Sequence, residues 1–312
     1  MGYNILVTGG AGYLGSTMVP ELLAKGHKVT VIDNFMYNQN SLAHVCNNPN
    51  FDVVRGDVRV DSTVLPLLKK ADIIIPLAAY VGAPLCARDP VGASSTNHGA
   101  ISMMLKHISP HQRILMPTTN SAYGSGDENH HCTEESPLRP MSLYAIEKVK
   151  VEEELMQHPN AISYRLATVF GMSPRMRIDL LVNDFTYRAL HDRAVVLFES
   201  SFKRNYIHVR DIARAFIHGI DNYEKMNGQI YNVGLSDANV SKLELCQVIQ
   251  KQLPGFTFVE AAIGKDPDQR NYIVSNAKIE ATGYRPAVSL EAGIAELIKG
   301  FTMIRNTCYG NV

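Results

Sequence analysis

The sequence predicts an α/β fold in which a doubly wound parallel sheet carries a smaller α/β substrate-binding lobe. Strand-like and helix-like apolar patterns alternate through the first half of the 312 residues. The first apolar segment, residues 4–8, runs into a glycine-rich turn and then into a helix start. A second strand, residues 29–32, ends in the acidic residue Asp33. This order is typical of the Rossmann type of sheet, which binds a dinucleotide beside its first strand.

The other elements of the first half follow from periodicity and helix caps. Residues 51–54 have the pattern of a third strand, and Asp61 or Ser62 can cap a helix that reaches residue 70. Residues 72–79 are largely apolar, as expected of a strand that is covered on both faces. The same patterns predict helices at 91–109 and 142–156, and strands at 113–116 and 161–166.

Beyond residue 171 the regular alternation weakens, which indicates a second, smaller lobe. Helical patterns remain at 179–190, 211–223, 241–253 and 290–304, and strand patterns at 195–198, 205–209, 229–233 and 256–259. We assign residues 1–170 and 211–235 to the Rossmann domain, and residues 171–210 and 236–312 to the smaller lobe. On this division the chain passes between the lobes more than once.

Composition and charge disfavour several classes of partner. The 30 basic and 30 acidic residues balance, so nothing favours nucleic acid or an anionic membrane surface. No apolar run approaches the roughly 18–20 residues of a membrane helix. The strand that begins at Asn4 leaves no room for a signal peptide, so we expect a cytoplasmic protein.

The cysteines and histidines give no sign of a disulfide or a metal. The cysteines are Cys46, Cys86, Cys132, Cys246 and Cys308. They are odd in number and form no CxxC pair, so we interpret them as free thiols in a reducing compartment. The run His130–His131–Cys132 lacks a second ligand cluster at useful spacing, so we expect a polar loop and no metal site.

The glycines after the first strand have the spacing of a pyrophosphate-binding turn. Gly9 permits the tight turn, Gly12 lets the backbone approach the phosphates, and Gly15 lets the helix pack closely on the strand. The helix N-terminus then offers unpaired N–H groups to the anion. Asp33 can accept both hydroxyls of an adenosine ribose and would repel a 2′-phosphate, and Asn34, not an arginine, follows it. The sequence therefore predicts NAD and not NADP as the cofactor.

Tyr144 and Lys148 are four residues apart, so they share one face of a predicted helix. A tyrosine has an ordinary pKa of about 10 and is a poor base at neutral pH. An adjacent ammonium and an oxidised nicotinamide would stabilise the phenolate and lower that pKa. Thr119, at the end of the fifth strand, can orient the substrate oxygen that gives up its proton. The alternative is a surface pair on an amphipathic helix, but the preceding dinucleotide motif and Thr119 favour catalysis.

A set of motifs spread over nearly the whole chain carries a family resemblance. They are Gly9–Gly10–Ala11–Gly12–Tyr13–Leu14–Gly15, Asp33, Gly56–Asp57–Val58, Leu77–Ala78–Ala79, Thr119 with Tyr123–Gly124, Tyr144 with Lys148, and Arg204–Asn205–Tyr206–Ile207–His208–Val209–Arg210–Asp211. Together they resemble the extended short-chain dehydrogenases, the NAD-dependent epimerases and dehydratases of sugar nucleotides. The resemblance implies an NAD-binding Rossmann domain and a smaller lobe that binds the sugar nucleotide. It also implies a homodimer formed through a bundle of the helices at 91–109 and 142–156.

The resemblance also assigns roles to individual residues. Thr119, Tyr144 and Lys148 are the implied catalytic residues. Asp57 and Val58 are implied to lie at the adenine, and Lys148 to contact the nicotinamide ribose as well. The predicted cofactor-binding residues are Gly9, Gly12, Tyr13, Leu14, Asp33, Asn34, Asp57, Val58, Leu77, Ala78, Ala79, Asn97, Tyr144 and Lys148.

A sugar nucleotide brings a diphosphate, which arginine binds bidentately. Arg204 and Arg270 match family positions that contact the diphosphate, and Asn183 matches a position near it. The alternative for each arginine is a solvated surface charge. The predicted substrate-binding residues are Val81, Gly82, Asn120, Ser121, Arg175, Arg177, Asn183, Arg204 and Arg270.

The chain departs from the family pattern directly after Thr119. Family 4,6-dehydratases carry an acidic pair, or at least a Glu, at this point, and that acid drives the loss of water from carbons 5 and 6. Asn120 and Ser121 cannot do general acid–base work at neutral pH. The sequence therefore favours oxidation at carbon 4, by a 4-epimerase or a 4-dehydrogenase, over dehydration.

One narrower hypothesis and one alternative function remain open. The segments Val81–Cys86 and Arg175–Phe185 resemble a subgroup near the bacterial GDP-heptose 4-dehydrogenases, which serve capsule and surface-polysaccharide biosynthesis. A non-catalytic NAD-binding regulator on the same fold is the other alternative. Such relatives typically lose the Tyr or the Lys, and this chain keeps both Tyr144 and Lys148.

Overall fold

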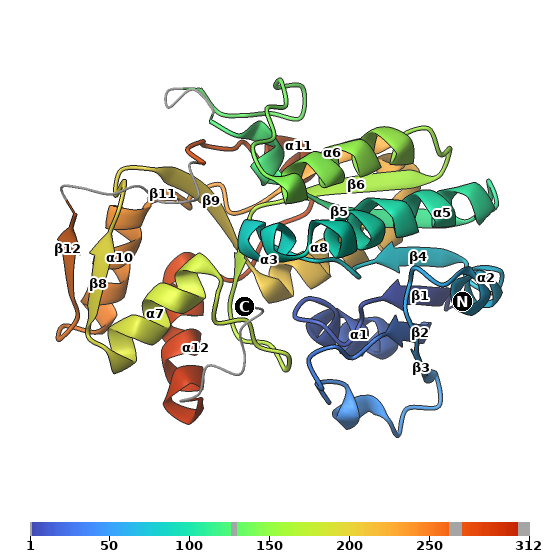
Figure 1. The fold of residues 1–312 in the computed structure, drawn as a ribbon, viewed down its shortest axis with the longest axis horizontal. Coiled ribbons are helices and arrows are strands. Elements are labelled where there is room, and N and C mark those ends of the chain that lie inside the picture. Colours follow the sequence, from blue (N-terminus) through green and yellow to red (C-terminus); the bar gives the residue numbers. More distant parts are fainter. Residues whose placement is uncertain (1, 126–129, 262–269, 305–312) are drawn as a thin grey trace.

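The protein folds into two lobes that lie side by side (Figure 1). The computed structural model describes residues 2–125, 130–261 and 270–304. The large lobe is built on one parallel sheet, and the smaller lobe gathers around the helices α7, α10 and α12 (Figure 1). Cys46, Cys86, Cys132 and Cys246 are free thiols, and Cys308 lies outside the described residues.

The large lobe contains a seven-stranded parallel sheet with the order β10-β6-β5-β4-β1-β2-β3. Its strands are β1 (Asn4–Thr8), β2 (Lys28–Asp33), β3 (Phe51–Arg55), β4 (Ile73–Pro76), β5 (Arg113–Thr119), β6 (Ala161–Leu166) and β10 (Gln229–Val233). The order reverses at β1, which pairs with β2 on one side and with β4 on the other. A doubly wound sheet opens its ligand crevice at such a reversal, outside the carboxyl ends of the strands. The predicted Rossmann fold is confirmed.

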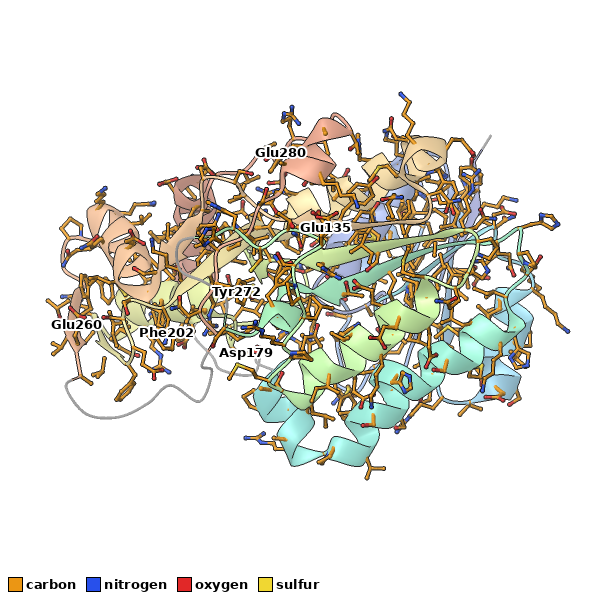
Figure 2. The ribbon with its side chains drawn as sticks, turned by 90° about the horizontal axis from the view of Figure 1, so that it is seen from above. Glu135, Asp179, Phe202, Glu260, Tyr272 and Glu280 are labelled. Atoms are coloured by element: carbon orange, nitrogen blue, oxygen red, sulfur yellow. The ribbon has the colours of Figure 1, made fainter. Side chains whose placement is uncertain are left out.

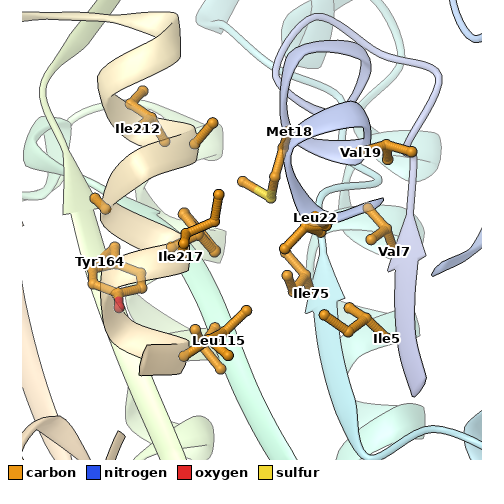
Figure 3. Packing of buried hydrophobic residues seen from close by; sticks show 14 of the residues in the cluster. Ile5, Val7, Met18, Val19, Leu22, Ile75, Leu115, Tyr164, Ile212 and Ile217 are labelled. Carbon is orange, nitrogen blue, oxygen red and sulfur yellow. The ribbon is translucent and has the colours of Figure 1, made fainter. Parts of the chain in front are cut away.

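Helices cover both faces of this sheet. On one face lie α1 (Gly15–Ala24) and α8 (Val209–Asp221), and on the other α2 (Asp61–Leu68), α5 (Ala100–His107) and α6 (Leu143–Leu155). Successive residues of β1 point to opposite faces, so Ile5 and Val7 join one core and Leu6 joins the other. Figure 3 shows the first core, where Met18 and Leu22 of α1 pack toward the strands. This packing fixes the start of α1 against the carboxyl end of β1.

The helix predicted at 91–109 is present from residue 90 to residue 107, but it contains a π-helical segment that the sequence did not predict. The chain forms α4 (Pro90–Ser94), the π-helical η2 (Ser95–Gly99) and then α5. A π-turn places one extra residue in the helix, and such segments are frequent at functional sites. Asn97 lies within it and is 1% exposed.

The smaller lobe combines three helices with two short sheets. Its elements are α7 (Leu181–His191), α10 (Lys242–Gln252), α12 (Leu290–Met303), the sheet β11-β9-β7 from Asn239–Ser241, Lys203–His208 and Thr168–Phe170, and the sheet β12-β8 from Thr257–Glu260 and Ala194–Leu197. Apolar side chains of the three helices, among them Phe185, Leu245 and Leu297, form its core. The chain enters this lobe through β7, which ends at Phe170 and pairs with β9. The division into domains made from the sequence stays a prediction.

Short helices complete the described part of the chain. They are η1 (Ala43–Val45), α3 (Ala83–Arg88), η3 (Asn120–Tyr123), α9 (Tyr223–Met226) and α11 (Ala277–Ala281). None of the helices formed by the described residues has both the length and the apolar character that crossing a bilayer requires. Within the same residues, no group of three or more His, Cys, Asp or Glu side chains could hold a metal ion.

Candidate active site

A cavity of about 400 Å³ lies at the carboxyl ends of β1, β2, β4 and β5, between the two lobes. Most of the residues predicted for the site line it. These are Gly9, Gly12, Tyr13, Leu14, Asp33, Asn34, Asp57, Val58, Leu77, Ala78, Ala79, Val81, Gly82, Thr119, Ser121, Tyr144, Lys148, Arg175, Arg177 and Arg270. Sequence motifs far apart in the chain therefore meet around one space.

The glycine turn has the geometry of a phosphate cradle. Gly9 has a φ of +66°, and a Cβ atom there would lie 2.6 Å from the backbone of Ala78. A Cβ on Gly15 would lie 2.5 Å from the backbone of Gly10. Only glycine fits these two positions. No side chain of the described residues caps α1 at Leu14, and the backbone N–H groups of Ser16 and Thr17 donate to the carbonyl oxygens of Gly12 and Leu14. The helix start therefore presents the positive end of its dipole to the cradle, which favours an anion such as the pyrophosphate of NAD.

Asp33 connects this cradle to the loop that follows β2. Its carboxylate accepts hydrogen bonds from the backbone N–H of Ala11 (3.0 Å) and of Phe35 (2.8 Å), and from the amide of Gln39 (3.3 Å). Burial raises the pKa of Asp33, and these hydrogen bonds oppose that shift. The carboxylate is thus held at the tip of β2, where the ribose of the adenosine is predicted to bind.

At the other end of the cavity, β5 and α6 bring together the three predicted catalytic residues. Thr119 ends β5, and its hydroxyl donates to Ser121 Oγ (3.0 Å) and accepts from the Ser121 N–H (3.1 Å). The Ser142 hydroxyl caps α6 by accepting from the N–H of Ala145 (3.3 Å), which fixes the helix turn that carries Tyr144. Lys148, one turn later, donates from Nζ to the carbonyl oxygen of Pro117 (3.0 Å).

Burial shifts the pKa values of the two helix residues in opposite directions. It raises the pKa of Tyr144 to about 12, although the charges of Arg177 and Arg270 oppose this rise. It lowers the pKa of Lys148 to about 8. In the cofactor-free protein Tyr144 is therefore protonated at neutral pH. A base at this position needs further positive charge, which an oxidised nicotinamide supplies when bound.

The lowered pKa of Lys148 predicts that the free energy of unfolding of the cofactor-free protein depends on pH. The unfolded chain has an ordinary lysine pKa of about 10.4, so between about pH 8 and pH 10 it binds more protons than the folded state does. The free energy of unfolding should therefore rise with pH across this range. We expect Lys148→Met to flatten the rise in urea unfolding, whereas Lys150→Met, an exposed position on the same helix, keeps it. An unchanged slope in Lys148→Met would contradict a buried ammonium with a lowered pKa.

Four predicted site residues do not line the cavity: Asn97, Asn120, Asn183 and Arg204. The amide of Asn97 accepts from the N–H of Tyr80 (2.7 Å) and donates to its carbonyl oxygen (2.9 Å), so it shapes the loop after β4. Asn183 donates to the carbonyl oxygen of Arg177 (2.8 Å) and to the Tyr13 hydroxyl (3.3 Å). Both asparagines therefore contact residues that do line the cavity.

Asn120 and Arg204 are buried and do not line the cavity. Asn120 is 1% exposed, and its amide makes no hydrogen bond to the described residues. Arg204 is 3% exposed in β9, next to the short strand β11. Their roles toward a substrate stay predictions.

The cavity is also lined by residues that sequence motifs did not identify, chiefly Tyr37, Arg59, Tyr80 and Tyr272. The Arg59 guanidinium donates hydrogen bonds to both carboxylate oxygens of Asp57, from Nε to Oδ1 (2.9 Å) and from Nη2 to Oδ2 (2.6 Å). These hydrogen bonds lower the pKa of Asp57. The adjacency of Asp57 and Arg59 was visible in the sequence, but their pairing at the cavity was not. Figure 2 shows Tyr272 and Asp179 in the region between the lobes.

The sequence model of the NAD dependent epimerase/dehydratase family matches residues 5–234. The chain belongs to this family. Membership confirms the family resemblance and NAD as the cofactor, and the cradle and Asp33 described above fit that cofactor. The GDP-heptose subgroup stays a prediction.

Relatives and solved structures of this family extend over almost the whole chain. UDP-glucuronic acid decarboxylase 2 of Arabidopsis thaliana is 29% identical over 96% of this chain and 68% of its own length. Low-salt glycan biosynthesis protein Agl12 of Haloferax volcanii is 28% identical over 93% of this chain and 96% of its own. The structure of DesIV, a dTDP-glucose 4,6-dehydratase from Streptomyces venezuelae with NAD and TYD bound, has a TM-score of 0.84 at 26% identity, covering 96% and 97% of the two chains. These relatives include a decarboxylase, a 4,6-dehydratase and a glycan biosynthesis protein, so family membership alone does not identify the reaction of this chain.

Proposed function

We propose that this chain is a cytoplasmic enzyme that uses NAD to oxidise carbon 4 of a nucleotide-diphosphate sugar, as a 4-dehydrogenase or a 4-epimerase. The observation that carries the proposal is the meeting of Thr119, Tyr144 and Lys148 in the cavity that also contains the dinucleotide cradle. A non-catalytic regulator would not need a partly buried tyrosine and a buried lysine at this point. Their burial carries a desolvation cost, which a catalytic role explains.

In this function each of the three residues acts on the 4-hydroxyl of the sugar. The phenolate of Tyr144 accepts the hydroxyl proton. The positive charges of Arg177 and Arg270 favour that phenolate, and the ammonium of Lys148, one turn further along α6, is proposed to add to this effect. The Thr119 hydroxyl, held by Ser121, orients the same oxygen. The NAD that the cradle and Asp33 would hold would supply the hydride acceptor for carbon 4.

The lining of the cavity argues against dehydration. Among the described lining residues the carboxylates are Asp33 and Asp57, both at the adenosine end. Next to Thr119 the cavity instead presents Ser121, whose hydroxyl accepts a hydrogen bond from the guanidinium of Arg270. Neither side chain can remove the proton from carbon 5 and protonate the hydroxyl that leaves carbon 6 as water at neutral pH.

The positive groups of the smaller lobe support a diphosphate substrate. Arg177 and Arg270 line the cavity from that lobe. The Arg177 guanidinium donates a hydrogen bond from Nε to the carboxylate of Asp179 (3.3 Å). Within this class we propose a GDP-heptose and a role in bacterial surface-polysaccharide biosynthesis. The resemblance of residues 81–86 and 175–185 to the GDP-heptose 4-dehydrogenases supports this narrower assignment.

We further propose a homodimer formed through the helices at 91–109, which comprise α4, η2 and α5, and at 142–156, which contain α6. Val91 and Ile146, in the segments that the resemblance assigns to the dimer, are apolar and 80% and 37% exposed. A partner subunit would cover these side chains.

The test is incubation of the enzyme with GDP-, UDP-, CDP- and dTDP-linked sugars in deuterium oxide, followed by mass spectrometry and analysis of stereochemistry. Loss of two hydrogens identifies a dehydrogenase, and an unchanged mass with altered stereochemistry at carbon 4 identifies an epimerase. Loss of water would overturn the interpretation of Asn120 and Ser121. Absence of conversion and of cofactor reduction across the panel would favour the regulator.

A further inference from the structure

The segment that precedes α7 lies against the phosphate cradle of the large lobe. The Ser173 hydroxyl donates to the carbonyl oxygen of Tyr13 (2.6 Å) and lies 3.0 Å from Ser16 Oγ. The backbone N–H of Arg175 donates to the same Ser16 oxygen (3.2 Å). The Tyr13 hydroxyl in turn donates to the carbonyl oxygen of Gly171 (2.6 Å). Residues 171–175 of the smaller lobe therefore cross the start of α1, where the pyrophosphate of NAD is predicted to bind.

From this segment the side chain of Arg175 reaches the adenosine end of the cavity. Its guanidinium carbon lies 4.3 Å from the centroid of the Tyr37 ring. It is 5% exposed, and the nearby charge of Asp33, the residue predicted at the ribose, partly offsets its desolvation. A buried guanidinium at this point is well suited to a dinucleotide, because the pyrophosphate brings negative charge to the adjacent helix N-terminus.

Tyr37 lies on the loop that follows β2, and the backbone of this loop has an uncommon conformation. Phe35 and Asn38 have positive φ values of 54° and 51°, which bulky residues such as Phe rarely adopt. The backbone N–H of Tyr37 donates to the Gln39 side chain (3.2 Å), and Gln39 donates to Asp33 (3.3 Å). Backbone strain of this kind persists only where the surroundings enforce it, and it concentrates at ligand sites. The loop thus presents the Tyr37 ring to the cavity at a fixed place beside Asp33.

We propose that Tyr37 and Arg175, here called the cofactor clasp, hold the adenosine and pyrophosphate half of NAD and slow its release between turnovers. The two residues come from different lobes and line the same cavity. Their stacking joins the lobes above the cradle, so NAD leaves only after this contact opens. Arg175 then serves the cofactor and not the substrate diphosphate, which revises the role predicted for it from the sequence.

The test measures NAD release from the holoenzyme. Enzyme loaded with NAD is diluted, the NAD that has dissociated is separated from the protein by rapid gel filtration at set times, and the NAD still bound is quantified after denaturation. We expect Arg175→Ala and Tyr37→Ala to release NAD about ten- to thirtyfold faster, the range of a desolvated cation–π contact. Tyr37→Phe keeps the ring and should release NAD at the wild-type rate. Arg175→Lys keeps the charge but loses the planar stack, so its rate should lie between wild type and Arg175→Ala.

The double variant shows whether Tyr37 and Arg175 act as a pair or make two independent contacts with NAD. If the residues act as a pair, Tyr37→Ala combined with Arg175→Ala releases NAD no faster than the faster single variant. Calorimetry with UDP and GDP on the same holoenzymes is the second readout, and we expect Arg175→Ala to leave their binding unchanged. Wild-type release that is as fast as that of the variants would overturn the clasp. So would loss of UDP and GDP binding in Arg175→Ala with NAD release at the wild-type rate. These measurements need no turnover, so they are independent of the sugar chemistry proposed above.

Discussion

Replacing Tyr144 by Phe should reduce turnover by about 10²–10⁴-fold while leaving NAD bound, because the variant loses only the phenolic oxygen that accepts the proton. The ring remains, so the packing of α6 and the cavity wall should not change. Turnover of the converted sugar nucleotide and the NAD content of the purified variant are measured together. A fall in activity with full NAD content is the expected pair of results.

Tyr80→Phe is the matched control, because Tyr80 lines the same cavity and its hydroxyl contacts Asp89. This variant should retain most of the activity. Because burial holds the Tyr144 pKa near 12 without the cofactor, the wild-type rate of the chemical step should rise with pH toward the pKa of the cofactor-bound tyrosine. Near-normal turnover of Tyr144→Phe would remove Tyr144 from the mechanism and with it the proposed chemistry.

The parts of the site that could be predicted are those encoded by short-range spacing. The glycines at 9, 12 and 15 act within one turn, and Tyr144 and Lys148 within one helix face, so the sequence alone places their side chains. The strands of the large sheet were predictable for a similar reason, since apolar runs covered on both faces stand out in a sequence.

Other features depend on contacts between distant segments. The apolar pattern of residues 91–109 did not reveal the π-helical segment, because a π-turn depends on where the backbone hydrogen bonds shift and carries no motif of its own. Its Asn97 contacts Tyr80, seventeen residues earlier. Arg175 is a clearer case. Its charge suggested a phosphate ligand, but whether it serves the substrate or the cofactor depends on contacts with Ser16 and Tyr37 that no local pattern encodes.

Glu152 is the residue of α6 whose removal should cost most stability. It follows Tyr144 and Lys148 on the same helix face and is 4% exposed. Its carboxylate accepts hydrogen bonds from the guanidinium of Arg165 (2.6 Å from Nη2) and from the hydroxyls of Ser163 (2.7 Å) and Thr118 (3.0 Å). The sequence shows three consecutive glutamates at 152–154 and does not tell which one is buried.

We expect Glu152→Ala to lower the free energy of unfolding by about 3–5 kcal/mol, because it leaves the Arg165 cation buried without its partner. Glu153→Ala, at the exposed neighbouring position, should change it by less than about 0.5 kcal/mol. Both values come from urea unfolding of the holoenzyme. Equal stability of the two variants would contradict the role of the buried pair.

The double variant Glu152→Met with Arg165→Met should be more stable than either single variant, since it removes both charges together. The consequence for the active site follows from Thr118, which contacts Glu152 and immediately precedes Thr119. In Glu152→Ala the end of β5 and the helix that carries Tyr144 lose a shared contact, so turnover should fall at temperatures where the protein is still folded. Restored stability without restored turnover in the double variant would show that this hydrogen bond aligns the two elements, beyond its contribution to stability.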